Sequence, residues 1–188
     1  MSACWPAKDS QMITYHDEEW GVPVHDDRKW FEFIVLDAFQ AGLSWSTVLR
    51  KRKNFRIAFD DFDFELIARY GEQKILDLQQ DTGIIRNRLK IQSTVSNAQA
   101  FIRIRQEFCT FDAYLWGFTE GKVIDNGLKN LSEMPARSPL SDQISKDMTR
   151  RGFRFAGSTI VYAFLQAAGV VNDHLVTCPR YRELGGRS

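Results

Sequence analysis

The feature of this sequence that most constrains its fold is a segment that would be apolar on nearly every side of a helix. It follows Asp26 and Asp27, which are suitable N-caps because a carboxylate accepts hydrogen bonds from the first backbone N–H groups of a helix. The apolar residues of the segment are Trp30, Phe31, Phe33, Ile34, Leu36 and Ala38. A helix that is apolar all round must be covered by other elements. We therefore predict a helix in the middle of the core, ended by Gly42.

Helical periodicity also dominates the rest of the chain, whereas the alternation typical of strands is absent. Apolar residues recur at Ile91, Val95, Ala98 and Ile102, which lie on one helical face and predict the longest helix. Further helices are expected at 44–59, 64–68, 74–78, 111–118, 138–151 and 158–168. Segment 119–138 contains glycine and proline breakers and is predicted to be an irregular, mobile loop. The sequence thus predicts an all-α fold.

Length and composition indicate an ordinary globular protein. The 188 residues are expected to form one domain spanning 1–188, and 25 basic against 24 acidic residues leave almost no net charge. A protein with this balance binds nucleic acid only if its cations gather on one face. No run approaches the roughly 18 apolar residues of a membrane span, and the first residues lack the apolar stretch of a signal peptide. We expect a cytoplasmic monomer without membrane contact.

The cysteines and histidines form a pattern that is typical of a metal site. Three cysteines without an export signal favour free thiols or metal ligands over a disulfide framework. Cys4 and His16 lie near the start of the chain, and His174 and Cys178 lie near its end. Two sulfurs and two imidazoles complete a tetrahedral zinc shell, which would make the site structural. Spacing alone leaves an alternative open, in which these are ordinary thiols and hydrogen-bonded imidazoles.

A short basic turn lies between two of the predicted helices. Gly152 and Gly157 bound the turn, Arg154 lies within it, and Ser158 and Thr159 follow at a helix start. Backbone N–H groups at a helix N-terminus form an anion site that suits a DNA phosphate. A plain turn with solvated arginines is the alternative.

A second group of cations, Arg86, Arg88 and Lys90, lies at the start of the longest predicted helix. Positive charges at a helix N-terminus oppose the helix dipole. Their placement therefore favours an external anion as their partner.

Aromatic residues and one carboxylate from two segments are candidates for a ligand pocket. Tyr15 and Trp20 belong to an acidic, aromatic block, and Asp37 and Trp45 lie about one helix further along. The rings have electron-rich faces, and an unpaired carboxylate at the end of an apolar helix would be costly. The set suits a flat, electron-poor ring. The alternative is that the tryptophans are core residues and that Asp37 is a paired surface carboxylate.

Four long motifs appear in order along the chain: Tyr15-His16-Asp17-Glu18-Glu19-Trp20-Gly21-Val22-Pro23, Gln40-Ala41-Gly42-Leu43-Ser44-Trp45, Gly83-Ile84-Ile85-Arg86-Asn87-Arg88 and Asn172-Asp173-His174. In this order and spacing they resemble the DNA-3-methyladenine glycosylase I family. The resemblance covers nearly the whole chain. It implies a compact helical bundle of the helix-hairpin-helix glycosylase type, in which a zinc clasp joins the termini.

The resemblance also implies the ligands of that clasp. Cys4, His16, His174 and Cys178 fall on the four family ligands of one structural Zn²⁺. The spacing from Cys4 to His16 looks one residue shorter than usual, a difference that a loop could absorb.

For DNA contact, the resemblance points to two segments. The turn from Gly152 to Thr159 matches the hairpin that grips the phosphate backbone, which gives DNA-binding roles to Gly152, Arg154, Gly157, Ser158 and Thr159. Leu43 falls on the loop that wedges into the opened duplex.

In the pocket, Tyr15, Trp20 and Trp45 fall on the aromatic lining that binds the base, and Asp37 falls on the base-contacting carboxylate. The resemblance implies that Asp37 is catalytic and that the Tyr15 hydroxyl helps to orient the base. The chain departs from the family in one respect, because the usual glutamate is replaced by the shorter Asp37, followed by the more apolar Ala38 and Phe39. The reach to the base and the base selectivity could therefore change.

The implied activity is hydrolysis of the N-glycosidic bond of 3-methyladenine in double-stranded alkylated DNA. The enzyme would be monofunctional and would leave an abasic site, because no lysine in the pocket segments is evident as a Schiff-base nucleophile for lyase activity. We expect no nucleotide cofactor. Asp173 is expected to cap the last short helix and not to act in catalysis. Two alternatives are a non-catalytic or altered-specificity binder of damaged DNA and a zinc-stabilised helical scaffold.

Overall fold

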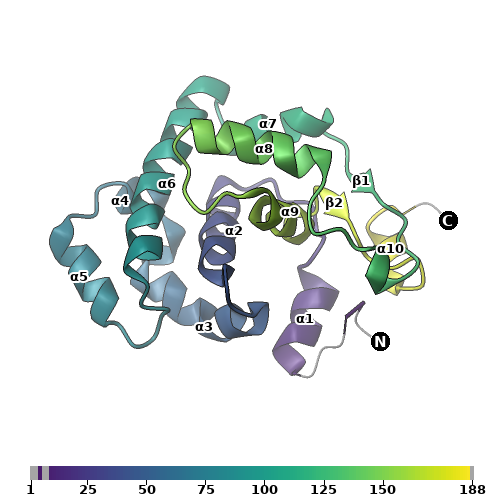
Figure 1. The fold of residues 1–188 in the computed structure, drawn as a ribbon, viewed down its shortest axis with the longest axis horizontal. Coiled ribbons are helices and arrows are strands. Elements are labelled where there is room, and N and C mark those ends of the chain that lie inside the picture. Colours follow the sequence, from purple (N-terminus) through teal and green to yellow (C-terminus); the bar gives the residue numbers. More distant parts are fainter. Residues whose placement is uncertain (1–3, 6–8, 187–188) are drawn as a thin grey trace.

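Helix α2 (Asp27–Gln40) runs through the middle of the molecule and is surrounded by other helices (Figure 1). The structure is a computed structural model and describes residues 4–5 and 9–186. Asp26 caps α2 by accepting a hydrogen bond from the backbone N–H of Lys29, and every residue from Trp30 to Phe39 is buried. The prediction of a central helix with an aspartate cap is confirmed.

The mostly helical fold predicted from the sequence is confirmed. The α-helices are α1 (Ser10–Glu18), α2, α3 (Trp45–Ala58), α4 (Phe64–Ile67), α5 (Glu72–Gln80), α6 (Arg88–Phe108), α7 (Phe111–Trp116), α8 (Pro139–Arg150), α9 (Ser158–Ala167) and α10 (Pro179–Glu183), and the 3-10 helices are η1 (Asp60–Phe62), η2 (Gly117–Thr119) and η3 (Leu131–Glu133). With 21 residues, α6 is the longest of these, as its apolar stripe predicts. None of the helices in the described ranges has both the length and the apolar character that crossing a bilayer requires.

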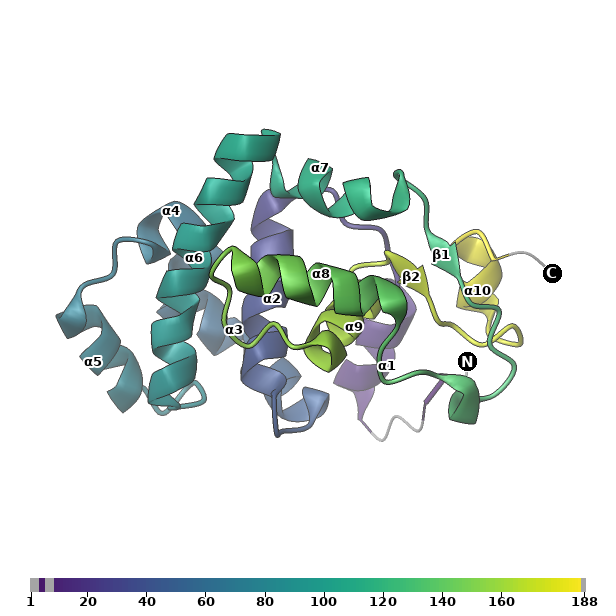
Figure 2. The same cartoon turned by 45° about the horizontal axis from the view of Figure 1, so that its top comes forward.

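The structure corrects the expectation that strands are absent. β1 (Ile124–Asp125) and β2 (Val171–Asn172) pair in parallel, with Ile124 opposite Val171. Strands of two residues are too short to show the alternation by which strands are recognised in a sequence. β1, β2 and α10 lie together at the end of the molecule opposite α5 (Figures 1 and 2). The rest of segment 119–138 is irregular apart from η2 and η3, and its mobility stays a prediction.

Helix α1 is not among the helices that the sequence predicts. Asp9 caps it by accepting a hydrogen bond from the backbone N–H of Met12 over 2.8 Å. Its sequence is mostly polar and has no clear apolar stripe, so periodicity does not reveal it. The helix is important for the site because it carries Tyr15 and His16, both of which are buried.

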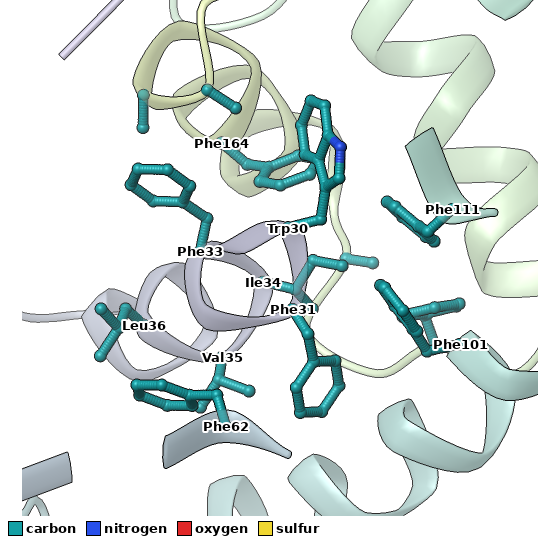
Figure 3. Packing of buried hydrophobic residues seen from close by; sticks show 14 of the residues in the cluster. Trp30, Phe31, Phe33, Ile34, Val35, Leu36, Phe62, Phe101, Phe111 and Phe164 are labelled. Atoms are coloured by element: carbon teal, nitrogen blue, oxygen red, sulfur yellow. The ribbon is translucent and has the colours of Figure 1, made fainter. Parts of the chain in front are cut away.

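Aromatic side chains leave α2 in several directions and hold the neighbouring helices against it (Figure 3). Trp30 packs on Phe164 of α9, with ring centroids 5.4 Å apart, and Phe31 packs on Phe101 of α6, with centroids 5.3 Å apart. Each buried aromatic side chain of this kind stabilises the fold by about 1.5–3 kcal/mol. This packing gives Asp37, near the end of α2, a fixed position.

Candidate functional site

One cavity brings together the four residues that the sequence predicts for a base pocket, Tyr15, Trp20, Asp37 and Trp45. Its volume is about 220 Å³, and its lining consists of Trp5, Met12, Tyr15, Trp20, Asp37, Gln40, Trp45, Met134, Ala163, Gln166 and Ala167. Tyr15 comes from α1, Trp20 from the turn that follows it, Asp37 from α2 and Trp45 from the first position of α3. The side chains of separate elements thus converge on one space and are not dispersed through the core.

Aromatic rings form two pairs on the walls of this cavity. The Tyr15 and Trp45 rings are tilted by 46° with centroids 5.2 Å apart, and Trp5 meets Trp20 edge-on with centroids 4.4 Å apart. The sequence argument misses Trp5, although its place directly after Cys4, a predicted metal ligand, is a signal that could have found it. An aromatic face attracts a cation by about 0.5–2 kcal/mol. The walls therefore suit a flat cationic ring.

The carboxyl group of Asp37 is buried, so the alternative of a paired surface carboxylate is wrong. Asp37 is 4% exposed, and its Oδ2 has no hydrogen-bond partner in the described part of the chain. Burial raises the pKa of Asp37 well above its usual value, although the charge of Arg52 opposes the rise. Burial therefore disfavours the charged form of this carboxyl group, whereas a cation brought next to Oδ2 would favour it.

An ion-pair network near Asp37 joins the elements that carry the pocket residues. Arg52 of α3 donates to both carboxylate oxygens of Glu19 at 2.6 Å, and its Nε donates to Glu32 of α2 at 2.8 Å. Although burial opposes ionisation of Glu32, hydrogen bonds from Arg52 and Arg56 lower its pKa to about 2. Sequence reasoning misses this role because Arg52 belongs to the basic run 50–53, which resembles a solvated helix face.

The four predicted metal ligands, Cys4, His16, His174 and Cys178, are buried together, and their ligand atoms all lie within 4.8 Å of one another. The sulfur of Cys4 is 3.5 Å from Nδ1 of His174, and the sulfur of Cys178 is 3.7 Å from the same nitrogen. The sulfur of Cys178 is also 3.8 Å from Nε2 of His16. Tetrahedral Zn²⁺ with bonds of about 2.0–2.3 Å places neighbouring ligand atoms roughly 3.3–3.8 Å apart. The donor set and these separations fit a zinc ion.

Neighbouring groups turn one lone pair of each imidazole toward this cluster. Nε2 of His174 donates to the carbonyl oxygen of Trp20 at 3.0 Å, which leaves Nδ1 as the nitrogen that faces the two sulfurs. Burial lowers the pKa of His174 to about 4, so its ring is neutral near pH 7. Nδ1 of His16 donates to Asp17 at 2.7 Å, so its Nε2 is an acceptor; Nε2 accepts a hydrogen bond from the backbone N–H of Cys4 at 3.1 Å and lies 3.8 Å from the sulfur of Cys178. Contacts of this kind orient the ligands of metal sites.

The basic turn between α8 and α9 is held in place by α6. Asn97 of α6 accepts a hydrogen bond from the backbone N–H of Arg154 at 2.7 Å and donates one to its carbonyl oxygen at 3.1 Å. Gly152 has a φ of +100°, which favours glycine, and Gly157 is the N-cap of α9. No side chain among the described residues caps α9. The side chain of Arg154 is exposed, so the turn has both a cation and helix N–H groups to offer an anion.

The remaining residues predicted to bind DNA differ in their surroundings. Leu43 is 44% exposed on the loop between α2 and α3, as a wedge requires. Thr159 is exposed at the start of α9. The hydroxyl of Ser158 lies 2.8 Å from that of Ser141, so it is already engaged within the protein. Accessible side chains therefore remain at Leu43, Arg154 and Thr159. The hydroxyl of Ser158 is hydrogen-bonded to Ser141 of α8.

Lys90 corrects the prediction of an external anion for the cations at the start of α6. It is buried, and its Nζ donates to the carbonyl oxygens of Phe39 and Ala41 at 2.9 and 2.6 Å. A lysine that satisfies the last carbonyl groups of α2 needs no external anion. Arg86 and Arg88 are exposed.

Asp173 does not cap the last helix, so that prediction is wrong. The N-cap of α10 is Cys178, because a cap must directly precede the first turn and Asp173 lies further upstream. The carboxylate of Asp173 instead accepts hydrogen bonds from Asn126, Tyr162 and Gln166, each at 2.7 Å.

Comparisons with known proteins agree with this geometry. The sequence model of a family described as methyladenine glycosylase matches residues 5–181. DNA-3-methyladenine glycosylase 1 of Escherichia coli strain K12 is 45% identical over 182 residues, which cover 96% of this chain and 97% of that protein. A crystal structure of 3-methyladenine DNA glycosylase I has a TM-score of 0.92 at 45% identity and covers 95% of this chain and 98% of its own. A variant of 3-methyladenine DNA glycosylase I solved in complex with 3-methyladenine has a TM-score of 0.93 at 34% identity, with coverage of 95% and 97%.

Proposed function

Because the chain belongs to the methyladenine glycosylase family, we propose that it removes 3-methyladenine from alkylated double-stranded DNA by hydrolysing the N-glycosidic bond. It is a DNA glycosylase, a hydrolase that acts on N-glycosyl bonds. The observation that carries this proposal is the buried Oδ2 of Asp37, which has no hydrogen-bond partner among residues 4–5 and 9–186, in a cavity walled by aromatic rings. Such a site favours a positively charged purine over its neutral parent.

Methylation at N3 makes the adenine of DNA cationic and weakens its bond to deoxyribose. The main task of the enzyme is therefore to recognise the damaged base. To reach the pocket, the nucleotide must leave the duplex, at a cost of a few kcal/mol. Leu43 would fill the space left in the stack. Tyr15, Trp20 and Trp45 would then stack around the cationic ring in the pocket.

Asp37 and Tyr15 are the residues to which we assign catalytic roles. Asp37 accepts a hydrogen bond from the exocyclic amine and opposes the charge of the base, and the Tyr15 hydroxyl helps to orient it. As the bond breaks, positive charge moves to the sugar, where the DNA phosphates and Asp37 can stabilise it. Water then attacks the sugar carbon, so the enzyme leaves an abasic site and needs no nucleotide cofactor.

The α8–α9 turn is our candidate for the helix-hairpin-helix element that grips the DNA backbone. Two helices joined by a turn with uncapped N–H groups at the start of α9, and the exposed Arg154 beside them, support this role. The positive φ of Gly152 allows the tight path of the turn, Gly157 is the N-cap of α9, and Ser158 and Thr159 lie at the helix start.

We also propose one structural Zn²⁺, held by Cys4, His16, His174 and Cys178. A four-ligand shell of this type is closed, so the ion stabilises the fold and takes no part in the reaction. Its protein ligands join Cys4, before α1, and His16, within α1, to the segment that precedes α10. A cytoplasmic location, in keeping with the bacterial relatives that the chain resembles, and a monomeric state are further proposals.

Release of free bases from methylated DNA tests the function. We expect 3-methyladenine in the supernatant, and a rate about 2- to 30-fold lower for Trp45→Ala, which removes one ring of the cavity wall. Release by the wild type no faster than by Trp45→Ala would contradict the proposal. Tight binding to an abasic duplex without release would instead favour the non-catalytic binder that the shorter Asp37 leaves as a second candidate.

A further inference from the structure

A buried carboxylate at the side of the pocket holds one of the residues that line it. Asp173 is 1% exposed, and its Oδ2 accepts hydrogen bonds from the Tyr162 hydroxyl and from Nε2 of Gln166. Its Oδ1 accepts from the side-chain amide of Asn126. A carboxylate offers only acceptors, so the NH₂ group of Gln166, and not its carbonyl oxygen, must face Asp173. The orientation of the Gln166 amide is therefore determined.

The carbonyl oxygen of Gln166 is consequently directed away from Asp173. Gln166 lines the same cavity as Asp37 and the aromatic rings. Within residues 4–5 and 9–186, its Oε1 has no hydrogen-bond donor. Two lining residues of this cavity therefore have an oxygen acceptor without a hydrogen-bond donor in the described residues, Asp37 on α2 and Gln166 on α9, and these helices pack on each other.

The chemistry of the substrate matches two acceptors. In DNA, the cationic 3-methyladenine base has one N–H donor group, its exocyclic amine, and this amine has two hydrogens. A 3-methylguanine base carries an oxygen at that position, which would face the two acceptor oxygens without any hydrogen between them. A site that leaves polar groups unpaired rejects a ligand far more strongly than one that merely lacks a contact.

We propose that Gln166 is a specificity-determining residue whose Oε1 accepts one hydrogen of the exocyclic amine of 3-methyladenine, while Asp37 accepts the other. Asp173 is a positioning residue that acts through Gln166, because both of its oxygens are occupied and it does not line the cavity. This role of Gln166 rests on the proposed function of the pocket. It explains how the pocket would reject 3-methylguanine.

Binding of the two free bases, followed through the fluorescence of the pocket tryptophans, tests the proposal. Gln166→Met keeps the length of the side chain but removes the acceptor. We expect it to weaken 3-methyladenine binding by about 10-fold and to change 3-methylguanine binding by less than about threefold, so that the preference is largely lost. An unchanged preference in Gln166→Met would overturn the inference even if the wild type releases 3-methyladenine from DNA.

The positioning role is tested by Asp173→Asn, which can present its own NH₂ to Gln166 and release the amide. We expect Asp173→Asn to lower the preference for 3-methyladenine over 3-methylguanine to nearly the level of Gln166→Met. The double variant should show no further loss, because both changes act on one contact. Losses that add in the double variant would overturn the positioning role. Asp147→Asn is the matched control, because Asp147 also accepts a tyrosine hydroxyl, that of Tyr114 at 2.9 Å, but is not a lining residue of this cavity.

A measurement on the wild type does not depend on the folding of Asp173→Asn. The side-chain N–H signals of Gln166 in an NMR spectrum should be protected from exchange with solvent, as expected for an amide bonded to a buried carboxylate. Rapid exchange of both hydrogens would show that Asp173 does not fix the amide. If the wild type binds neither base, the proposed function itself fails, which is a different outcome from equal preferences in wild type and Gln166→Met.

Discussion

The Trp20 ring meets the His174 ring edge-on with centroids 4.5 Å apart, and the Trp20 carbonyl oxygen accepts a hydrogen bond from Nε2 of His174. Trp20 lines the base pocket, whereas His174 belongs to the proposed zinc site. The pocket wall and the metal cluster therefore share a packed contact. A change in the metal cluster should therefore alter the position of Trp20 in the pocket wall.

Loss of the metal ligands is expected to impair the pocket as well as the fold. Protein purified without added metal should contain about one equivalent of zinc by elemental analysis. Cys178→Ser should lower this below about half an equivalent, reduce the thermal midpoint and weaken 3-methyladenine binding. Cys109→Ser is the control, because Cys109 is exposed and free. Full 3-methyladenine affinity in zinc-free Cys178→Ser would show that Trp20 does not depend on the cluster.

Asp37→Asn should slow base release without unfolding the protein. The variant removes a charge that opposes the cationic base, and hydrogen bonds to charged groups contribute about 1.5–3 kcal/mol, so release should fall roughly 10- to 100-fold. Oδ2 has no protein partner to lose in the described residues, so the circular dichroism spectrum should stay the same. Asp142→Asn, on the surface of α8, serves as the control. Unchanged release from methylated DNA would remove Asp37 from the mechanism.

Asp37 should also make stability depend on pH. Burial raises its pKa above the usual value of 3.8, so between that value and the raised pKa the folded protein keeps a proton that the unfolded chain has released. The free energy of unfolding therefore falls as pH rises through this window. Asp37→Asn lacks this slope, so wild type should lose stability relative to the variant as pH rises from about 4. Thermal midpoints of both proteins across pH check this, and parallel curves would contradict it.

Arg52→Met should destabilise the fold by about 3 kcal/mol, because it leaves Glu32 buried without one of its partners and breaks the link to Glu19. Urea denaturation measures the difference. Arg50→Met is the matched control, because Arg50 belongs to the same helix but is exposed and lies 4.0 Å from Asp9, so its loss should change stability by less than about 0.5 kcal/mol. Equal effects of the two variants would mean that Arg52 is not a structural link.

Arg154→Ala should weaken DNA binding to a similar extent for all sequences. If Arg154 contacts a phosphate, the slope of log affinity against log salt should fall by about one. Arg28→Ala is the control, because Arg28 is paired with Asp63 at the start of α2 and is not part of the turn. An unchanged salt dependence in Arg154→Ala would exclude the turn from the interface.

The helices could be predicted because their signals are local. Asp26, Ser44 and Ser138 each accept a hydrogen bond from a backbone N–H three residues ahead, and the apolar stripe of α6 repeats within a few turns. Periodicity does not predict helix α1, because its sequence has no regular apolar stripe and its buried residues, Tyr15 and His16, are covered only by tertiary contacts. The kinds of side chain and their spacing make the four pocket residues and the four cluster residues candidates, and the resemblance to a known family assigns roles to the same residues. The structure brings each set together, while their chemical roles await the experiments above.

Contacts between residues far apart in the chain could not be predicted from local pattern. The local pattern predicts a free cation at Lys90, whose Nζ instead donates to the carbonyl oxygen of Ala41 at the end of α2. It predicts a helix cap at Asp173, which instead accepts a hydrogen bond from Gln166. The two-residue strand β1 pairs with β2, which lies far along the chain. The amino-acid sequence by itself determined the helices and the kinds of side chain available for a pocket, because hydrogen bonds and packing within a few residues suffice for those. Only the tertiary structure decided which polar groups are satisfied and which, like Oδ2 of Asp37, remain for a ligand, because that depends on partners brought close by packing.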